Sequence, residues 1–511
     1  MRSTIWDVLA AGGAERDAIG APGRPWLTHG ALRDLARDTV AALNGVGIGR
    51  DDRVAVVLPN GPEMAAAFVG IACAAAAAPL NPAYRAEEFE FYLSDLKPRA
   101  LVAKAGDDTP ARAVAGRLGI PVIELLPDEA GPAGGYRLGL DALPDAAPRA
   151  GGTARADDIA LVLHTSGTTA RPKIVPLSNA NLAASARSIA ATLALAPGDR
   201  CLNVMPLFHI HGLVAAVLST LDAGAAVSCT PGFNALRFFA WLDEVDPTWY
   251  TAVPTMHQAI LARVGHNAER LARGTRLRFV RSSSASLPPQ VMAELETTFG
   301  CPVVEAYGMT EASHQMASNP LPPRARKPGS VGVAAGPEVA IMDEEGHLLP
   351  QGAVGEVVIR GPNVTRGYES NPDANLKAFA AGWFRTGDQG RLDEEGYLFL
   401  TGRLKEIINR GGEKVSPLEV DTVIMDHPAV AQVVTFAMPH PKLGEEVAAV
   451  AVLREGMQAT EAEIRAFAAA RLADFKVPRR VLFVAEIPKG ATGKLQRVGL
   501  AQKLGLTEAA A

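Results

Sequence analysis

The sequence contains few cysteines and no cysteine pair. Only four occur in 511 residues, Cys73, Cys201, Cys229 and Cys301, and they lie far apart without a C-x-x-C motif. This spacing argues against a zinc site or a disulfide framework and is typical of the reducing cytosol, so we expect a cytoplasmic protein. The net charge is −5, and lysines and arginines are spread along the chain without forming a basic stripe. We therefore expect no nucleic-acid partner.

A long hydrophobic run is also lacking. The most apolar stretch, from Met64 to Ala78, is rich in alanine, too short to span a bilayer and stopped by Pro79. We predict that it forms a buried helix. The N-terminal segment has acidic residues within its first fifteen positions and no apolar core, which makes a poor export signal. The sequence thus predicts no membrane insertion, leaves peripheral association open and gives no oligomeric state.

The order of apolar patterns predicts the fold class. A chain of 511 residues is longer than one core usually serves, so we expect two or more domains. Short aliphatic or β-branched runs alternate with helical patterns over the N-terminal part, which predicts an α/β fold with parallel-rich sheets covered by helices. The runs expected to be strands are 53–59, 100–104, 121–126, 159–164, 225–230, 249–253, 277–282 and 302–308.

Changes in composition indicate where the parts of the chain meet. Residues 128–152 are rich in Gly, Pro and Ala and are predicted to form a loop between two lobes. After about Pro337 the pattern becomes hairpin-like, which predicts a small β-rich lobe. We expect a large N-terminal domain over residues 1–404 and a small α+β domain over residues 405–511.

The stretch HTSGTTARPK, from His164 to Lys173, combines small hydroxyl residues, a glycine and a lysine directly after a predicted strand. Backbone N–H groups and hydroxyls at such a point form an anion cradle, and the lysine adds positive charge, so polyphosphate is the expected ligand. A Walker motif is excluded because Pro172 precedes the lysine and the following KIVPL is typical of a strand. The alternative is a surface turn rich in small polar residues.

Three further stretches carry side chains suited to a nucleotide. In EAYGMTE, Tyr307 could stack on a purine, Thr310 could donate to a phosphate and Glu311 could bind Mg²⁺, which prefers oxygen ligands. In GWFRTGDQG, Asp388 follows a tight turn and is suited to accept hydrogen bonds from ribose hydroxyls. In PKGATGKLQR, Lys494 lies in a glycine-flanked segment that could carry a cation into a site.

Together these motifs resemble the acyl-activating, AMP-forming ligase family, which comprises acyl-CoA synthetases, luciferases and adenylation domains. The resemblance covers nearly the whole chain, and the motifs occur in the family's order with similar spacing. It implies that ATP, Mg²⁺ and coenzyme A take part in the reaction, with Glu311 as the magnesium ligand. It also implies a mobile C-terminal domain, with Lys405 at the hinge and Gly411 and Gly412 beginning the segment that accompanies thioester formation.

The same resemblance implies roles for individual residues. Lys494 would be the catalytic lysine of adenylate formation, acting with Thr310, Glu311 and Lys173. Residues implied to surround the nucleotide are Thr165, Ser166, Gly167, Thr168, Thr169, Lys173, Ser284, Ala285, Ser286, Glu305, Ala306, Tyr307, Gly308, Thr310, Asp388, Arg403 and Lys494.

Three positions depart from the family's pattern. The phosphate loop usually carries glycine where this chain has Ala170 and again where it has Ile174. Ala170 adds a methyl group where a glycine could take a positive φ, so we expect lower loop flexibility. His440 stands where an aspartate is common, so the local contact made there is open.

The region expected to face the acid is polar, whereas members acting on fatty or aryl acids line it with apolar side chains. His209, His211, Ser284 and His314 supply several hydrogen-bond donors, and this suits an acid with a second carboxylate, which is costly to bury without donors. The stretches PLNPAYRAEEFEFYLSD, HTSGTTARPK, PLFHIHGL, TWYTAVPTMHQAIL and RSSSASL are also similar to the oxalate–CoA ligase branch of the family. This resemblance implies a small-molecule carboxylic acid substrate, with oxalate preferred.

Simpler interpretations of these histidines remain open at this point. His209 could serve as a gate beside the acyl tunnel, His211 could cap a helix at Gly212, and His314 could be a core histidine. His257 is expected to pack on a helix. Three other functions remain as alternatives: a medium-chain or aryl acyl-CoA synthetase, an adenylation domain that loads a carrier protein, and a nucleotide-binding protein without catalysis.

Overall fold

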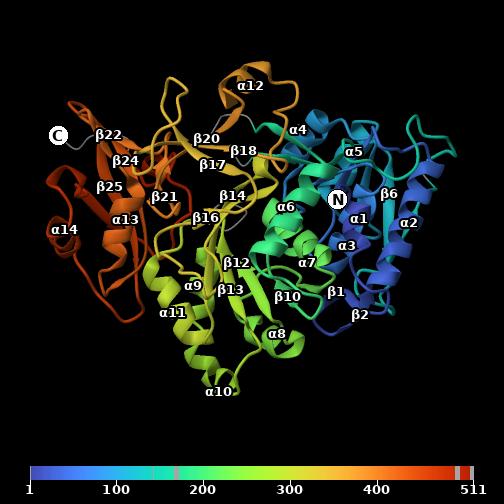
Figure 1. The fold of residues 1–511 in the computed structure, drawn as a ribbon, viewed down its shortest axis with the longest axis horizontal. Coiled ribbons are helices and arrows are strands. Elements are labelled where there is room, and N and C mark those ends of the chain that lie inside the picture. The colour runs from blue at the N-terminus through green and yellow to red at the C-terminus, as the bar shows by residue number, and fades with distance from the viewer. Residues whose placement is uncertain (1, 142, 166–171, 490–494, 507–511) are drawn as a thin grey trace.

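The computed structural model describes residues 2–141, 143–165, 172–489 and 495–506. Over these residues the strands form four sheets, with the N-terminal half and the C-terminal end of the chain at opposite sides of the molecule (Figure 1). Two large sheets come from the N-terminal part, and two smaller ones follow. The predicted α/β class is confirmed.

The first large sheet is parallel through its centre and antiparallel at both edges. Its strand order is β16-β15-β14-β13-β12-β10-β11-β1-β2. The strands are β1 (Asp17–Ala21), β2 (Arg24–Thr28), β10 (Arg200–Asn203), β11 (Ala226–Cys229), β12 (Trp249–Ala252), β13 (Phe279–Ser283), β14 (Val303–Met309), β15 (His314–Ser318) and β16 (Val333–Ala334).

The second large sheet has the order β7-β6-β5-β3-β4-β8-β9, again with antiparallel pairs at its edges. Its strands are β3 (Arg53–Val57), β4 (Ala76–Pro79), β5 (Ala100–Lys104), β6 (Val122–Pro127), β7 (Tyr136–Gly139), β8 (Ile159–His164) and β9 (Ile174–Ser178).

Helices fill the space between the two large sheets and cover their outer faces. Val54 and Val56 face the central core, whereas Ala55 and Val57 face an outer core, so β3 is buried on both sides and reads as a continuous apolar run. The central helices are α1 (Ile5–Leu9), α2 (His29–Gly45), α3 (Pro62–Ala72), α6 (Asn179–Thr192), α7 (Ser219–Asp222) and the π-helix η1 (His211–Leu218). The outer helices are α4 (Ala86–Leu96) and α5 (Pro110–Arg117) on the second sheet, and α8 (Phe238–Val245), α9 (Pro254–Leu261) and α11 (Pro289–Phe299) on the first.

Two sequence-based predictions about this region are wrong in part. The alanine-rich stretch does not continue as a helix to Ala78: α3 ends at Ala72, and residues 76–79 form β4, which pairs with β3 and β8. Alanine favours helix, but here parallel pairing in a fully buried sheet outweighs that propensity, because small side chains fit between two packed layers. The predicted loop over residues 128–152 contains β7, which pairs with the edge strand β6.

The predicted β-rich lobe is the third sheet, ordered β17-β18-β20-β19 with β21 paired to β20. Hairpin pairing fixes Asp388 of β20 opposite Arg403 of β21. The strands are β17 (Glu338–Met342), β18 (Gly355–Arg360), β19 (Phe379–Ala380), β20 (Trp383–Leu392) and β21 (Leu398–Arg403). Three short helices are not among the central and outer helices named above: α10 (Ala268–Leu271), η3 (Thr310–Ala312) and α12 (Pro372–Ala378).

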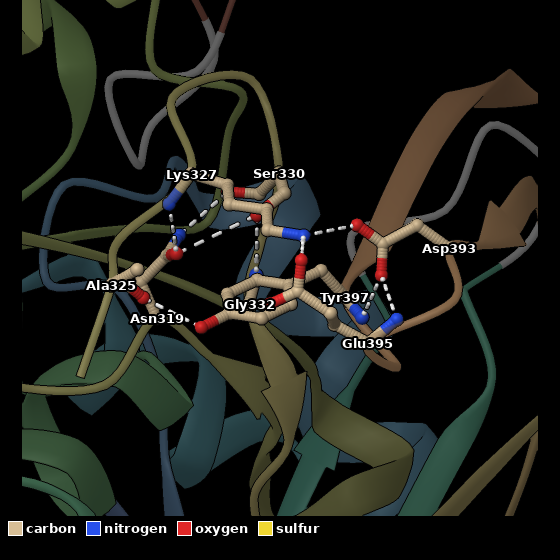
Figure 2. A network of polar contacts seen from close by, with 8 residues as sticks. All are labelled: Asn319, Ala325, Lys327, Ser330, Gly332, Asp393, Glu395 and Tyr397. Carbon is tan, nitrogen blue, oxygen red and sulfur yellow. Dashed lines mark hydrogen bonds and ion pairs between the residues drawn. The ribbon is translucent and has the colours of Figure 1, made fainter.

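A polar network joins this lobe to the first large sheet (Figure 2). It connects the segment between β15 and β16 to the turn between β20 and β21. Lys327 forms an ion pair with Asp393 at 2.6 Å, and its backbone N–H donates to Asn319 at 3.1 Å. The Tyr397 hydroxyl donates to the Ala325 carbonyl at 2.6 Å. These contacts fix the hairpin that carries two of the predicted nucleotide-binding residues.

The C-terminal residues form the fourth sheet, ordered β23-β22-β25-β24 with β26 paired to β25, at the red end of Figure 1. Gln258 of α9 donates to the Ala431 carbonyl at 3.1 Å and links this unit to the large part. Its elements are β22 (Ile408–Arg410), β23 (Glu413–Val415), α13 (Pro417–Met425), β24 (Val430–His440), β25 (Gly444–Leu453), α14 (Glu461–Ala469), β26 (Arg480–Phe483) and α15 (Leu500–Lys503). Among the described helices, none has the length and apolar character needed to cross a membrane.

Candidate active site

The candidate site begins where two neighbouring parallel strands end. β13 and β14 pair with Ser283 beside Ala306, so the residues after β13 and the last residues of β14 lie at the same edge of the sheet. Ligands of open α/β sheets bind at the carboxyl ends of such strands. Ser284, Ala285 and Ser286 follow β13 directly, and Tyr307 lies near the end of β14. The fold therefore places two of the predicted nucleotide-binding segments side by side.

Tyr307, Asp388 and Arg403 form one connected group. The Tyr307 hydroxyl donates to Asp388 Oδ2 at 2.5 Å, and Arg403 Nε lies 3.2 Å from Asp388 Oδ1. Asp388 raises the pKa of Arg403, while burial raises the pKa of Tyr307. Asp388 thus already accepts from protein donors on one side, and the half-exposed Arg403 provides a fixed positive charge at the same point.

Glu311 and Lys173 meet at a tyrosine that the sequence analysis missed. The Tyr368 hydroxyl donates to Glu311 Oε1 at 2.8 Å, and Lys173 Nζ lies 4.3 Å from the centre of the Tyr368 ring. Burial raises the pKa of Glu311. Burial also lowers the pKa of Lys173, and the charge of Lys405 acts in the same direction while Glu311 opposes it. No sequence pattern marks Tyr368, because its partners lie far away along the chain.

Charge connects the two groups. Arg403 lowers the pKa of Glu311 against the effect of burial, and Glu311 raises the pKa of Arg403, so the two side chains lie close enough to interact. Thr310 opens η3 directly beside Glu311. The arrangement places two cations, Lys173 and Arg403, around one buried carboxylate. This is a suitable environment for a polyphosphate with a divalent cation.

Two strands flank the segment that is predicted to bind phosphate. β8 and β9 pair antiparallel, and Thr165 and Lys173 close the pair: the Thr165 N–H donates to the Lys173 carbonyl at 2.9 Å, and the Lys173 N–H donates to Thr165 Oγ1 at 3.0 Å. Ile174 is buried as the first residue of β9. The remaining predicted loop residues, Ser166, Gly167, Thr168 and Thr169, and the departure at Ala170 lie outside the described residues.

Lys494 also lies outside the described residues, whereas the described residues on either side of 490–494 make defined contacts. Lys489 and Leu495 pair as an isolated antiparallel bridge. Beyond them, Arg497 forms ion pairs with Asp421 at 2.6 Å and with Glu406 at 3.4 Å. The C-terminal side of the predicted catalytic segment is therefore attached to α13 and to the chain just after Lys405.

Three other residues of the EAYGMTE stretch contact the segments next to β14. The Leu287 N–H donates to Glu305 Oε1 at 2.8 Å, and burial raises the pKa of Glu305 to about 8. The Ala306 carbonyl accepts from Ser283. Gly308 lies so close to β15 that a Cβ atom there would come 1.8 Å from the His314 carbonyl oxygen. Direct contact of these three residues with a nucleotide stays a prediction.

The four residues predicted to hold the acid come together. His211 Nδ1 lies 3.0 Å from Ser284 Oγ, and its ring centre lies 5.0 Å from that of His314. The backbone N–H of His211 donates to His209 Nδ1 at 3.3 Å. Ser284 has φ 74° and His314 has φ 101°, in the left-handed region that favours glycine. Held backbone strain of this kind is often found at ligand sites.

The histidines differ in their surroundings. His257 lies buried on α9 and contacts the Tyr250 hydroxyl at 3.2 Å, as expected for a packed histidine. His211 is fully buried at the start of η1, and a π-helix frequently marks a functional site. Its ring lies behind Ser284, against Thr251 and Arg281. Arg281 is a second residue that sequence analysis missed, although an arginine inside a buried strand pattern was a usable signal.

The predicted hinge residue Lys405 lies near enough to Lys173 for its charge to lower the pKa of that lysine, and the predicted coenzyme A residues follow it along the chain. Lys405 is exposed between β21 and β22, and Gly411 and Gly412 form the β22–β23 turn, where the Gly411 N–H donates to the Leu443 carbonyl at 2.9 Å. His440 ends β24, and its Nδ1 accepts from the backbone N–H groups of residues 442 and 443 at 3.2 and 3.1 Å. An imidazole nitrogen therefore acts as a turn acceptor where the family often has aspartate.

Comparison with known families agrees with this architecture. Residues 7–369 match the model of the AMP-binding enzyme family, and residues 419–494 match that of the AMP-binding enzyme C-terminal domain. The chain belongs to the AMP-binding enzyme family, and the prediction of the family is confirmed.

Individual relatives match over nearly the full length. The chain is 47% identical to the oxalate–CoA ligase of Arabidopsis thaliana, over 96% of this chain and 95% of that protein. It is 42% identical to the oxalate–CoA ligase of Saccharomyces cerevisiae, over 89% of this chain and 87% of that protein. Among solved structures, the ATP-bound MatB from Rhodopseudomonas palustris matches with a TM-score of 0.86 and 29% identity, over 99% of this chain and 98% of that one.

Proposed function

We propose that this protein is an ATP-dependent acid–CoA ligase and that its acid is oxalate. The observation that carries the proposal is the group of His209, His211, Ser284 and His314, which gathers hydrogen-bonding side chains beside the Tyr307 group. The names of the Arabidopsis and yeast relatives support the choice of acid. ATP and coenzyme A are the co-substrates that membership in the family supports.

In the first half-reaction, a carboxylate oxygen of the acid attacks the α-phosphorus of ATP, and pyrophosphate leaves. The barrier arises mainly because two anions must approach each other. We propose that Lys173 and Arg403 reduce this repulsion from the large domain and that Lys494 does so from the C-terminal domain. Glu311 is a buried single carboxylate beside both cations, which fits a ligand of Mg²⁺; that ion, when bound, neutralises phosphate charge.

In the second half-reaction, the thiol of coenzyme A attacks the carbonyl carbon of the acyl-adenylate, AMP leaves, and a thioester forms. The two steps need different groups near one carbon atom. We propose that residues 405–511 rotate against residues 1–404 about Lys405, which would exchange Lys494 for the Gly411–Gly412 turn. Hinges of this kind are confined to a few residues at a domain junction.

Selection of oxalate follows from the cost of burying its second carboxylate. An ionised carboxylate taken out of water must be paired or fully hydrogen-bonded. Ser284, His209 and His314 supply donors at the end of the site, whereas an apolar pocket would favour fatty or aryl acids. The polar lining therefore favours oxalate over the medium-chain and aryl alternatives.

Pyrophosphate release with ATP, Mg²⁺ and single acids tests the proposal directly. We expect the highest kcat/KM with oxalate, a lower value with malonate and the lowest values with acetate, hexanoate and 4-coumarate. Release of AMP should depend on coenzyme A once adenylate has formed. A preference for hexanoate or 4-coumarate would contradict oxalate as the acid, and failure with every acid would favour a nucleotide-binding protein without catalysis.

His314→Ala should weaken the binding of oxalate. Loss of one hydrogen bond to a charged group costs about 1.5–3 kcal/mol, which corresponds to a rise of about 10- to 150-fold in KM for oxalate. KM for ATP should change little. His347→Ala is the matched control, because His347 is exposed and forms a local pair with Asp343. An unchanged KM for oxalate in His314→Ala would remove this histidine from the acid site.

Lys405→Pro should slow thioester formation more than adenylate formation, because proline fixes φ and restricts the preceding residue. The substitution leaves the neighbouring backbone bonds intact, since Leu404 N–H donates to Gly387 and Glu406 N–H donates to Arg403. Separate assays of pyrophosphate exchange and of thioester formation from acyl-AMP give the two rates. Lys405→Ala separates loss of the side chain from loss of backbone freedom, and equal slowing of both steps by proline would contradict the hinge.

A further inference from the structure

A buried arginine lies directly behind the proposed acid site. Arg281 is fully buried on β13, its Nη2 donates to Gln315 Oε1 at 3.2 Å, and its Nη1 lies 3.4 Å from His211 Nε2. Among the residues that the structure describes, no carboxylate forms an ion pair with it. Burial lowers the pKa of Arg281 to about 9, which still leaves the guanidinium charged at pH 7. A buried cation is costly, so this position calls for a specific explanation.

The guanidinium sets the direction of the hydrogen bonds around it. Arginine carries only donors, so an N–H at His211 Nε2 would point toward the hydrogens of Arg281. Nε2 therefore accepts, and the Thr251 hydroxyl, 2.6 Å from Nε2, donates to it. In a neutral imidazole the proton then lies on Nδ1. Nδ1 is 3.0 Å from Ser284 Oγ and donates to that oxygen.

The neighbouring amide has the matching orientation. The Gln315 Nε2 group donates to the Ala335 carbonyl at 2.9 Å and to Thr192 at 3.2 Å, so its Oε1 is the atom that faces Arg281. Gln315 Oε1 and His211 Nε2 thus both present an acceptor to the Arg281 guanidinium. We refer to Arg281, His211 and Ser284 as the relay. Its hydrogen bonds all run in one direction, with Arg281 donating toward His211 and His211 donating to Ser284.

We propose that Arg281 is a positioning residue that fixes the Nδ1–H form of His211 and so leaves the Ser284 hydroxyl hydrogen to donate to the distal carboxylate of the acid. This proposal rests on oxalate as the proposed acid. It adds which atom donates each hydrogen bond in the site, whereas the proposed function requires only that donors are present. With Nδ1–H bonded to its oxygen, Ser284 offers a hydrogen to the substrate. With His211 reversed, that hydrogen would go to Nδ1, and Ser284 would offer a lone pair, which repels a carboxylate.

The reversed state can be produced by Arg281→Met. Methionine is apolar and close in length to arginine, so the variant removes a costly buried charge with a small change in side-chain volume and is expected to fold. Without the guanidinium, His211 can donate from Nε2 to Thr251 and accept at Nδ1 from Ser284. Arg276→Met is the matched control, since Arg276 lies nearby in the sequence in an exposed ion pair with Asp246. Arg281→Lys keeps a donor-only cation and should retain part of the effect.

The first measurement needs no substrate. Nitrogen-15 NMR of histidine-labelled protein, with His211→Gln to assign the signal, reports which ring nitrogen carries the proton. We expect Nδ1–H in the unmodified protein and a shift toward Nε2–H in Arg281→Met. An Nε2–H tautomer in the unmodified protein would overturn the proposal, whether or not oxalate is the acid.

The second measurement compares oxalate with glycolate, in which a hydroxymethyl group, a hydrogen-bond donor, replaces the distal carboxylate. Arg281→Met should raise KM for oxalate by about 10- to 150-fold, the effect of one hydrogen bond to a charged group, with little change in kcat or in KM for ATP. The kcat/KM for glycolate should stay constant or rise, because its hydroxyl can donate to a Ser284 lone pair. General damage to the site would lower kcat/KM for oxalate and for glycolate to the same extent, and this result would contradict the relay.

A double-mutant cycle tests whether Arg281 acts through Ser284. In a Ser284→Ala background, Arg281→Met should raise KM for oxalate by less than about threefold, because the group it orients is gone. Fully additive effects would overturn the relay. If the unmodified protein does not use oxalate at all, the proposed function fails, and the NMR result still decides the polarity of His211 by itself.

Discussion

Lys494→Ala should reduce the rate of adenylate formation by a few hundredfold while leaving the reaction of preformed acyl-AMP with coenzyme A close to normal. Removal of one preorganised charge donor at a developing anion costs about 3–4 kcal/mol. In the proposed mechanism Lys494 acts only while the carboxylate meets the α-phosphate, so its loss should not affect the second step. Pyrophosphate exchange measures the first rate, and thioester formation from synthetic oxalyl-AMP measures the second.

Lys489→Ala provides the control for this experiment. Lys489 lies five positions earlier and pairs with the exposed Glu486 at 2.9 Å, so its charge is already used locally. Both half-reactions should keep their rates in this variant. If Lys494→Ala formed adenylate normally, or slowed both steps equally, the assignment of the catalytic lysine would be wrong.

Glu311→Gln should produce the other large loss, of about a hundredfold or more in adenylate formation, with a higher Mg²⁺ requirement. The neutral amide is close in shape and can still accept from the Tyr368 hydroxyl, so the fold should be retained. What is lost is the negative charge between Lys173 and Arg403, which is the charge that would hold the metal. Mg²⁺ titrations of pyrophosphate release provide the measurement, and Glu395→Gln, at an exposed turn, is the control.

The pH dependence gives a second signature of Glu311. Burial raises the pKa of this carboxyl above its ordinary value. A proton on the carboxyl competes with the metal, since cation binding requires the ionised form. The concentration of Mg²⁺ needed for half-maximal rate should therefore rise as the pH falls toward that raised pKa, and Glu311→Gln should lose this dependence. A pH-independent Mg²⁺ requirement in the unmodified protein would contradict Glu311 as the ligand.

Local patterns predicted most elements of the fold, because the spacing of apolar residues and the positions of glycine and proline are local properties of the sequence. The strand runs around Val54, Leu161 and Val280 and the hairpin-like lobe after Pro337 all appear in the structure. The alanine stretch before Pro79 was mispredicted, because the sequence alone cannot tell that residues 76–79 lie between two strands. Pairing with distant strands, and not intrinsic propensity, decides such a short segment.

The contacts between motifs were beyond the reach of sequence reasoning. Tyr368 has no motif of its own, yet it joins Glu311 to Lys173. Asp388 was predicted to accept from a ribose, but its contact with the Tyr307 hydroxyl depends on a hairpin crossing the end of β14. Arg281 begins the RSSSASL stretch, but the sequence assigned it no role, because its importance arises from burial beside His211.

The sequence by itself determined the family, the alternation of strands and helices, and the kinds of side chain available for phosphate, metal and acid. These follow from residue identity and spacing, which are properties of the chain before it folds. Only the tertiary structure decided which of those side chains touch, which are buried and in which direction their hydrogen bonds run. Such properties depend on groups tens to nearly two hundred residues apart being packed within a few ångströms, where burial changes pKa values and each donor meets its acceptor.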